Sequence, residues 1–130
     1  RTPTDILPMF SHLDEVPVVL VVTVDLTQVV SVDKDLDRVG LDTGASIYPL
    51  VWNILLAARA EGLGGVLTTV VAPAEADVQA LLGLPEEHAI AALIPLGRPV
   101  RQLTRLRRRP VEDFTTIDRY DGVPLGPAGE

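Results

Sequence analysis

The chain has 130 residues, of which 47% are hydrophobic and 22% are charged, and its formal net charge is −7. This length is enough for one domain with a core, and the composition is too apolar for a disordered chain. The acidic excess argues against nucleic acid as a partner, and the lack of cysteine excludes disulfides, thiolate catalysis and zinc–thiolate sites. No apolar run reaches the roughly 20 residues that cross a membrane, so we expect a cytoplasmic protein with no membrane partner.

The first half of the chain begins with an apolar strand. Val16 to Leu26 is rich in β-branched residues and almost uninterrupted in its apolarity, which predicts a strand buried on both faces. Residues 27–42 are rich in aspartate and have no hydrophobic period. They predict an exposed, mobile acidic loop.

A helix is predicted from Thr43 to about Glu61, with Asp42 or Thr43 as its N-cap and Gly62 as its left-handed end. Its opposite face is also apolar, so we expect a long helix buried on all sides, between sheets or against a second subunit. The predicted core stripe consists of Ile47, Leu50, Val51, Ile54, Leu55 and Ala58.

The second half alternates strands and a short helix. Gly64 to Val71 predicts a strand, Glu75 to Leu82 a helix closed by Gly83, and Ala89 to Leu96 a third strand that is apolar throughout. Residues 110–120 form a short extended or mixed segment. This order predicts an α/β or α+β layered sandwich.

Basic residues gather just after the third strand, where six of the eleven lie without an intervening acid. This run permits three interpretations: a solvated loop, a nucleic-acid patch, or a phosphate clamp of guanidinium groups. The nucleic-acid patch lacks interleaved aromatic residues and is opposed by the net charge. The six residues are Arg98, Arg101, Arg105, Arg107, Arg108 and Arg109.

The two histidines, His12 and His88, lie in no spacing typical of a catalytic triad or a metal site, and we predict no metal ligands. Tyr48 and Trp52 are predicted to belong to the core or to a dimer interface, although Tyr48 could line a pocket mouth. Because the sequence does not begin with Met, we expect a fragment, a processed chain or part of a longer protein.

A series of short motifs resembles the nitroreductase family in order and spacing, and it extends from Gly44 to Tyr120. The motifs are GASIYP at 44–49, NILLAARA at 53–60, GLG at 62–64, GLP at 83–85, LGRP at 96–99 and RRRPVE at 107–112. The resemblance implies one α+β domain over 1–130, a three-layer α-β-α sandwich. Its sheet would be mixed and mainly antiparallel, with a long buried central helix. The family's N-terminal helical part is not among these residues.

The resemblance also implies the cofactor FMN and an oxidoreductase activity. Hydride would pass from NAD(P)H through flavin N5 to a nitroaromatic, quinone or similar electron-poor aromatic acceptor, with no catalytic acid or base needed from this chain. Backbone near the flavin would come from Gly65, Leu67, Thr68 and Thr69, and the FMN phosphate would be held by Arg107 and Arg109. Arg108 would point to solvent in an extended segment.

A homodimer is implied as well, with the central helix at its core and residues 111–130 as an arm that crosses to the partner's sheet. Phe114 and Ile117 would be the arm's apolar contacts. The alternative function is a non-catalytic module with the same fold that stores flavin or dimerises. A purified protein with flavin absorbance that NAD(P)H bleaches would distinguish the enzyme from this module.

Overall fold

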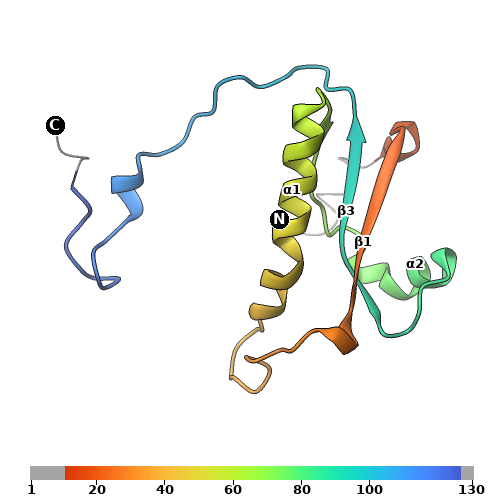
Figure 1. The fold of residues 1–130 in the computed structure, drawn as a ribbon, viewed down its shortest axis with the longest axis horizontal. Coiled ribbons are helices and arrows are strands. Elements are labelled where there is room, and N and C mark those ends of the chain that lie inside the picture. The colour runs from red at the N-terminus through yellow and green to blue at the C-terminus, as the bar shows by residue number, and fades with distance from the viewer. Residues whose placement is uncertain (1–10, 127–130) are drawn as a thin grey trace. The chain divides into compact units, whose positions relative to one another are not determined.

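The computed structural model describes residues 11–126, and the chain divides between Val100 and Arg101 into two compact units. The first unit contains three strands, β1 (Val18–Asp25), β2 (Gly64–Gly65) and β3 (His88–Gly97). Its two α-helices are α1 (Asp42–Ala60) and α2 (Glu75–Leu82) (Figure 1). The predicted α+β class and the order of the elements are therefore confirmed, although the predicted strand over 64–71 is shortened to two residues.

The strands form one sheet in the order β1-β3-β2, and both neighbouring pairs are antiparallel. β1 and β3 pair along their whole length, from Val18 opposite Leu96 to Asp25 opposite His88. The register shifts between the pairs Val22–Ala92 and Thr23–Ile90, so Ala91 is an extra residue in β3. Such a bulge bends a strand and redirects its side chains.

The second edge of β3 has partners from four successive parts of the chain. Gly64 and Gly65 pair with its end, and Thr68 exchanges two backbone hydrogen bonds with Leu93 at 2.9 and 3.0 Å. Closer to its start, Glu75 Oε1 accepts a 2.6 Å hydrogen bond from the amide of Ile90. Gln79 Nε2 donates to the carbonyl of His88. Side chains of α2 thus take the place of a neighbouring strand, which satisfies backbone groups that would otherwise lose water without compensation.

The core lies between the sheet and α1. Val51 and Ile94 are fully buried, and with Val22 and Ala92 they form a cluster that the partly buried Ile47, Ile54 and Leu55 extend. Each fully buried aliphatic side chain stabilises the fold by roughly 1.5–3 kcal/mol. Figure 1 shows α1 and α2 on opposite sides of β1 and β3.

The prediction that α1 is buried on all sides is wrong for the single chain. Trp52 is 63% exposed, Leu56 53% and Tyr48 42%, and Leu50 of the predicted core stripe is 52% exposed. The physical reason is that α1 has the three-stranded sheet on one face only. The other five residues of the predicted stripe are half-buried or buried.

The ends of the helices follow the predicted glycines but not the predicted cap. Gly62 and Gly83 have φ values of 77° and 65°, the left-handed conformation that favours glycine. At its start, α1 has Leu41 as N-cap without a side-chain hydrogen bond. The Asp42 carboxylate instead accepts a 2.8 Å hydrogen bond from the amide of Val32, so it binds the preceding loop rather than its own helix.

The acidic loop before α1 is organised around a buried carboxylate. Asp33 Oδ2 accepts hydrogen bonds from the Leu41 amide at 2.7 Å and from the Arg38 guanidinium at 2.6 Å. A hydrogen bond with the Asp42 carboxyl, the Leu41 amide and the Arg38 side chain together hold the pKa of Asp33 well below its ordinary value. That residues 27–42 are mobile stays a prediction, for which hydrogen exchange at 33–38 is the measurement.

The second unit is short and folds on itself. A 3-10 turn, η6 (Val111–Phe114), precedes a narrow loop closed by a bridge between Thr116 and Pro124. The Ile117 amide donates to Val123 and the Leu125 amide to Thr115, each at 2.9 Å. The C-terminal segment therefore has local backbone pairing of its own.

The carboxylate that caps the edge of β3 gives a stability prediction. Glu75→Ala leaves the Ile90 amide without its acceptor, so the free energy of unfolding should fall by about 1–3 kcal/mol in urea titrations. Glu75→Gln keeps an acceptor and should cost less. Asp77→Ala is the control, since Asp77 also lies in the first turn of α2 but is exposed. Equal losses at both positions would mean that the effect comes from the helix dipole alone.

The Asp33 cluster predicts a pH dependence. A carboxyl group whose folded pKa lies below its unfolded value of about 4 stabilises the fold above that pH, and the stabilisation disappears as pH falls toward the folded pKa. Asp33→Asn should therefore lower the free energy of unfolding at pH 7, and its difference from wild type should shrink below about pH 4. Asp35→Asn, at an exposed position in the same loop, should show little effect at either pH. A penalty for Asp33→Asn that is equal at pH 3 and pH 7 would contradict the prediction.

Candidate functional site

The segment that follows β2 holds three of the predicted flavin contacts, and they differ in accessibility. Thr68 is buried, and both its backbone groups are bonded to Leu93. Leu67 is half-buried and packs against the core cluster. Thr69 is exposed, and its amide donates no hydrogen bond to another described residue. Thr69 is therefore the residue of this group whose backbone is most available to a ligand.

Packing within the first unit explains why residue 65 is a glycine. A Cβ built on Gly65 would lie 2.5 Å from Leu96 Cδ2, 3.0 Å from Leu55 Cδ2 and 3.2 Å from the carbonyl of Pro95. A Cβ on Gly64 would lie 3.1 Å from Pro99 Cβ. The sequence predicted that a flat ligand would lie close to this backbone. On the Cβ side, however, the space is occupied by β3, α1 and the residues after β3. Only the backbone of Gly65 remains for a ligand.

The predicted phosphate residues lie in the second unit. Arg107, Arg108 and Arg109 line one open hollow of about 570 Å³ together with Val111 and Phe114. The guanidinium carbon of Arg109 lies 5.3 Å from the centre of the Phe114 ring, a cation–π distance. None of these three arginines forms an ion pair with a described carboxylate. All three arginines line the same hollow. The expectation that Arg108 points to solvent while Arg107 and Arg109 point to the ligand, as in an extended segment, is therefore not met.

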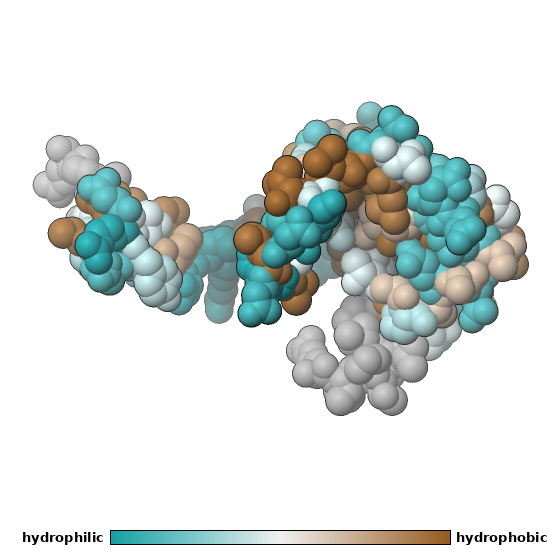
Figure 2. Space-filling model, turned by 90° about the horizontal axis from the view of Figure 1, so that it is seen from below, coloured by the Kyte–Doolittle hydropathy of each residue, from teal (hydrophilic) through white to brown (hydrophobic). Residues whose placement is uncertain are grey.

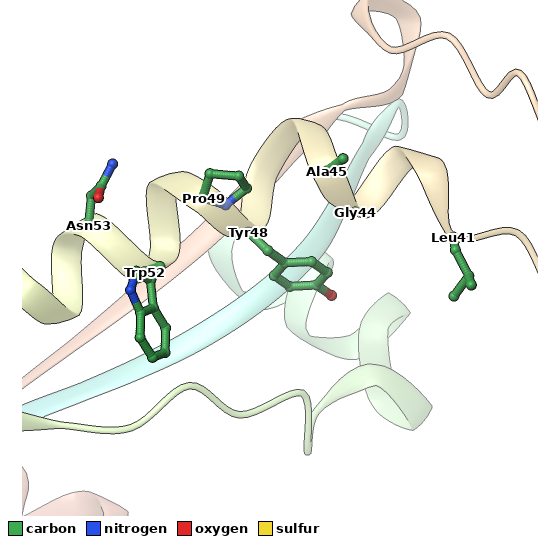
Figure 3. Close-up of a pocket in the computed structure, with 7 residues that line it drawn as sticks. All are labelled: Leu41, Gly44, Ala45, Tyr48, Pro49, Trp52 and Asn53. Atoms are coloured by element: carbon green, nitrogen blue, oxygen red, sulfur yellow. The ribbon is translucent and has the colours of Figure 1, made fainter. Parts of the chain in front are cut away.

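The exposed face of α1 carries a second hollow, which the sequence did not identify. It has a volume of about 600 Å³, and Figure 3 shows the rings of Tyr48 and Trp52 on the same side of the helix, one turn apart. Pro49 has no amide hydrogen, so it removes the helical donor for the carbonyl of Ala45. The hollow is lined by Leu41, Gly44, Ala45, Tyr48, Pro49, Trp52 and Asn53.

Apolar residues are exposed elsewhere on the chain too, and the face shown in Figure 2 has brown, apolar residues interspersed among polar ones. The i, i+4, i+8 spacing of Tyr48, Trp52 and Leu56 was the sequence signal for a stripe on α1. Within residues 11–126, no three His, Asp or Glu side chains gather in a way that could hold a metal ion. No helix in that range has the length and apolarity to span a membrane.

Comparison with solved structures identifies the fold. The chain matches a nitroreductase-like family protein from Bacillus cereus with a TM-score of 0.60 and 18% sequence identity. The match covers 90% of this chain and 61% of that protein, so this chain spans less than two thirds of the length of its structural relative. At this identity the likeness shows the fold alone. No curated protein matches the sequence.

The chain belongs to the nitroreductase family, whose sequence model matches residues 10–98. This range contains the whole sheet, both α-helices and the segment around Thr69. It ends before Arg107 and Arg109, so their assignment depends on the motif RRRPVE and on the geometry of their own unit. Nitroreductases are typically FMN-dependent oxidoreductases.

Proposed function

We propose that this chain belongs to an FMN-dependent oxidoreductase that acts on nitroaromatic, quinone or similar electron-poor acceptors. Family membership over residues 10–98 is the observation that carries the proposal. When bound, FMN would accept hydride from NAD(P)H at N5 and deliver it to the acceptor. This chemistry belongs to the cofactor and requires no nucleophile from the protein.

The residues of this chain fit a phosphate-bearing flavin in two respects. Arg107 and Arg109 present guanidinium groups that no described carboxylate neutralises, and such groups bind phosphate oxygens through paired hydrogen bonds. Thr69 offers a surface backbone amide that no other described residue accepts from, where a donor could stabilise the electron-rich edge of the ring. Leu67 and Thr68 would support that segment from the core side, and Gly65 would contribute backbone only.

The working unit in this proposal is a homodimer formed through the exposed face of α1. Tyr48, Trp52 and Leu56 follow one another at one-turn spacing, and each is at least 42% exposed, so they form an apolar stripe on this face. Burying such side chains stabilises an interface by up to roughly 1.5–3 kcal/mol each, and twofold pairing is the commonest arrangement of soluble oligomers. The exposed Phe114 and Ile117 would be the apolar contacts of the C-terminal arm.

Cofactor binding tests the function directly. The purified chain should acquire flavin absorbance when FMN is added, and NAD(P)H should bleach it under anaerobic conditions. A chain that stays colourless in excess FMN would contradict the proposal. A chain that binds FMN but is never bleached would favour the storage module instead.

The arginine hollow predicts which side chains hold the phosphate. Arg107→Ala or Arg109→Ala should weaken FMN binding by about 1.5–3 kcal/mol, the scale of charge-assisted hydrogen bonds. Arg108→Ala should have a smaller effect, because the resemblance of the motif RRRPVE assigns the phosphate contacts to Arg107 and Arg109. Arg105→Ala is the matched control, because it belongs to the same run but does not line the hollow. Equal FMN affinities for all four variants, measured by fluorescence titration, would refute the assignment.

The dimer proposal is tested through the outer face of α1. Light scattering should give twice the chain mass of 14.0 kDa, and Trp52→Glu should shift the protein toward monomer at micromolar concentration. Leu81→Glu is the control, since Leu81 is 82% exposed on α2, away from this face. Deletion of the residues after Pro110 should also yield monomer or aggregate. A wild-type chain that is monomeric and binds FMN would overturn the proposal.

A further inference from the structure

A third hollow lies deeper in the first unit, between the acidic loop, the start of α1 and the sheet. It has a volume of about 360 Å³ and is called the inner hollow below. Val24 and Leu26 contribute from the end of β1, and Ala89 and Ala91 from β3. Ile47 closes it on the side of α1. All these residues belong to one compact unit, so the inner hollow does not depend on the placement of the C-terminal segment.

Small residues keep the inner hollow open. Gly40, Gly44, Ala89 and Ala91 all line it, and none has a side chain longer than a methyl group. A Cβ on Gly44 would lie 3.0 and 3.1 Å from two ring carbons of Tyr48, so the glycine lets this ring lie against the helix. Ala91 is the extra residue of the β3 bulge, and bulges occur often beside binding sites.

The polarity of the inner hollow is low but not zero. None of the residues that line it carries a charge. The Tyr48 hydroxyl lies 3.4 Å from the carbonyl oxygen of Ala91, a long and therefore weak hydrogen bond. This hydroxyl can give up that contact at little cost and donate to a better acceptor. The lining thus fits an apolar ring with one acceptor atom.

The outer wall of the inner hollow is held by an ion pair between the buried Asp33 and the exposed Arg38. Gly40 and Leu41 form part of this wall, and the Leu41 amide donates to Asp33, which the Arg38 guanidinium also contacts. A Cβ on Gly40 would lie 3.3 Å from Asp33 Oδ1, so glycine permits this approach. These bonds restrain Gly40 and Leu41, and restraint of a wall in the unliganded protein lowers the entropic cost of binding.

We infer that the inner hollow is a binding site for a small, uncharged ring compound that carries one hydrogen-bond acceptor. Its volume lies in the range of small-ligand pockets, which are mostly apolar with a few polar groups that fix orientation. Tyr48 supplies the donor, the two alanines of β3 supply the floor, and Asp33 positions the wall. No residue assigned above to the flavin lines this hollow, so the site does not depend on FMN binding.

The test uses two bicyclic probes of almost equal shape, 1-indanone and indane, of which only the first has a carbonyl acceptor. Neither exchanges hydride with flavin under the conditions of binding, so the measurement is separate from the oxidoreductase proposal. Titration of the full chain without FMN, followed by NMR of the alanine methyl groups, should shift Ala89 and Ala91 and give a Kd on the order of 1 mM or tighter for 1-indanone.

Four variants give the assignment its controls. Ala89→Leu fills the floor and should raise the Kd of both probes about tenfold or more. Tyr48→Phe should raise the Kd of 1-indanone by about threefold to tenfold, as expected for the loss of one neutral hydrogen bond, and should leave the Kd of indane unchanged. Asp33→Asn should weaken both probes by loosening the wall. Ala57→Leu, on the exposed side of α1, should change neither.

The result that overturns the inference is equally direct. Wild-type protein that shows no shift at Ala89 and Ala91 with saturating 1-indanone does not contain the site. Shifts confined to Trp52 would place the probe in the hollow on the exposed face of α1, and they would also reject the inference. If Ala89→Leu fails to fold, the different responses of the two probes to Tyr48→Phe decide the question, and equal responses count against it.

Discussion

The fold of the first unit depends on the hydrogen bonding of β3. This strand is apolar from Ala89 to Leu96, and four of its residues, Ala92 to Pro95, are buried, so an unpaired amide or carbonyl there would be costly. β1 covers one edge from Leu96 to His88, interrupted only by the bulge at Ala91. The other edge is covered in pieces, by two glycines, by Thr68 and by two polar side chains of α2. The path of the segment between α1 and β3 is therefore determined by the need to provide hydrogen-bond partners for the backbone of β3.

This arrangement explains why the segment around Thr69 is exposed. After Gly65 the chain leaves the edge of β3, returns for one bridge at Thr68 and then enters the turn before α2. A continuous strand would have committed every second amide to the sheet. The interrupted pairing instead leaves Thr69 at the surface, with an amide that donates to no residue within 11–126. Such a short, well-anchored segment is suited to present backbone donors to a ligand.

The sequence predicted the order and type of the elements because their signals are local. The apolar period of α1, the left-handed glycines at 62 and 83, and the β-branched run of β1 act within a few residues. It could not predict the burial of α1, because that depends on how many strands and subunits cover the helix. The predicted N-cap was wrong for a similar reason, since the Asp42 carboxylate accepts a hydrogen bond from the Val32 amide in the preceding loop.

The candidate site shows the same limit at the level of single residues. A glycine pair after a helix is compatible with a nearby ligand or with nearby protein, and only the neighbours of the missing Cβ distinguish them. At Gly65 these neighbours are Leu96, Leu55 and Pro95, from elements that are distant in sequence. At Gly44 and Gly40 they are Tyr48 and Asp33, side chains that shape the inner hollow without filling it. Gly40 and Gly44 therefore bear on ligand binding through the side chains that they admit, because Asp33 and Tyr48 lie at the wall of a hollow, whereas the neighbours of Gly65 belong to the packed sheet and helix.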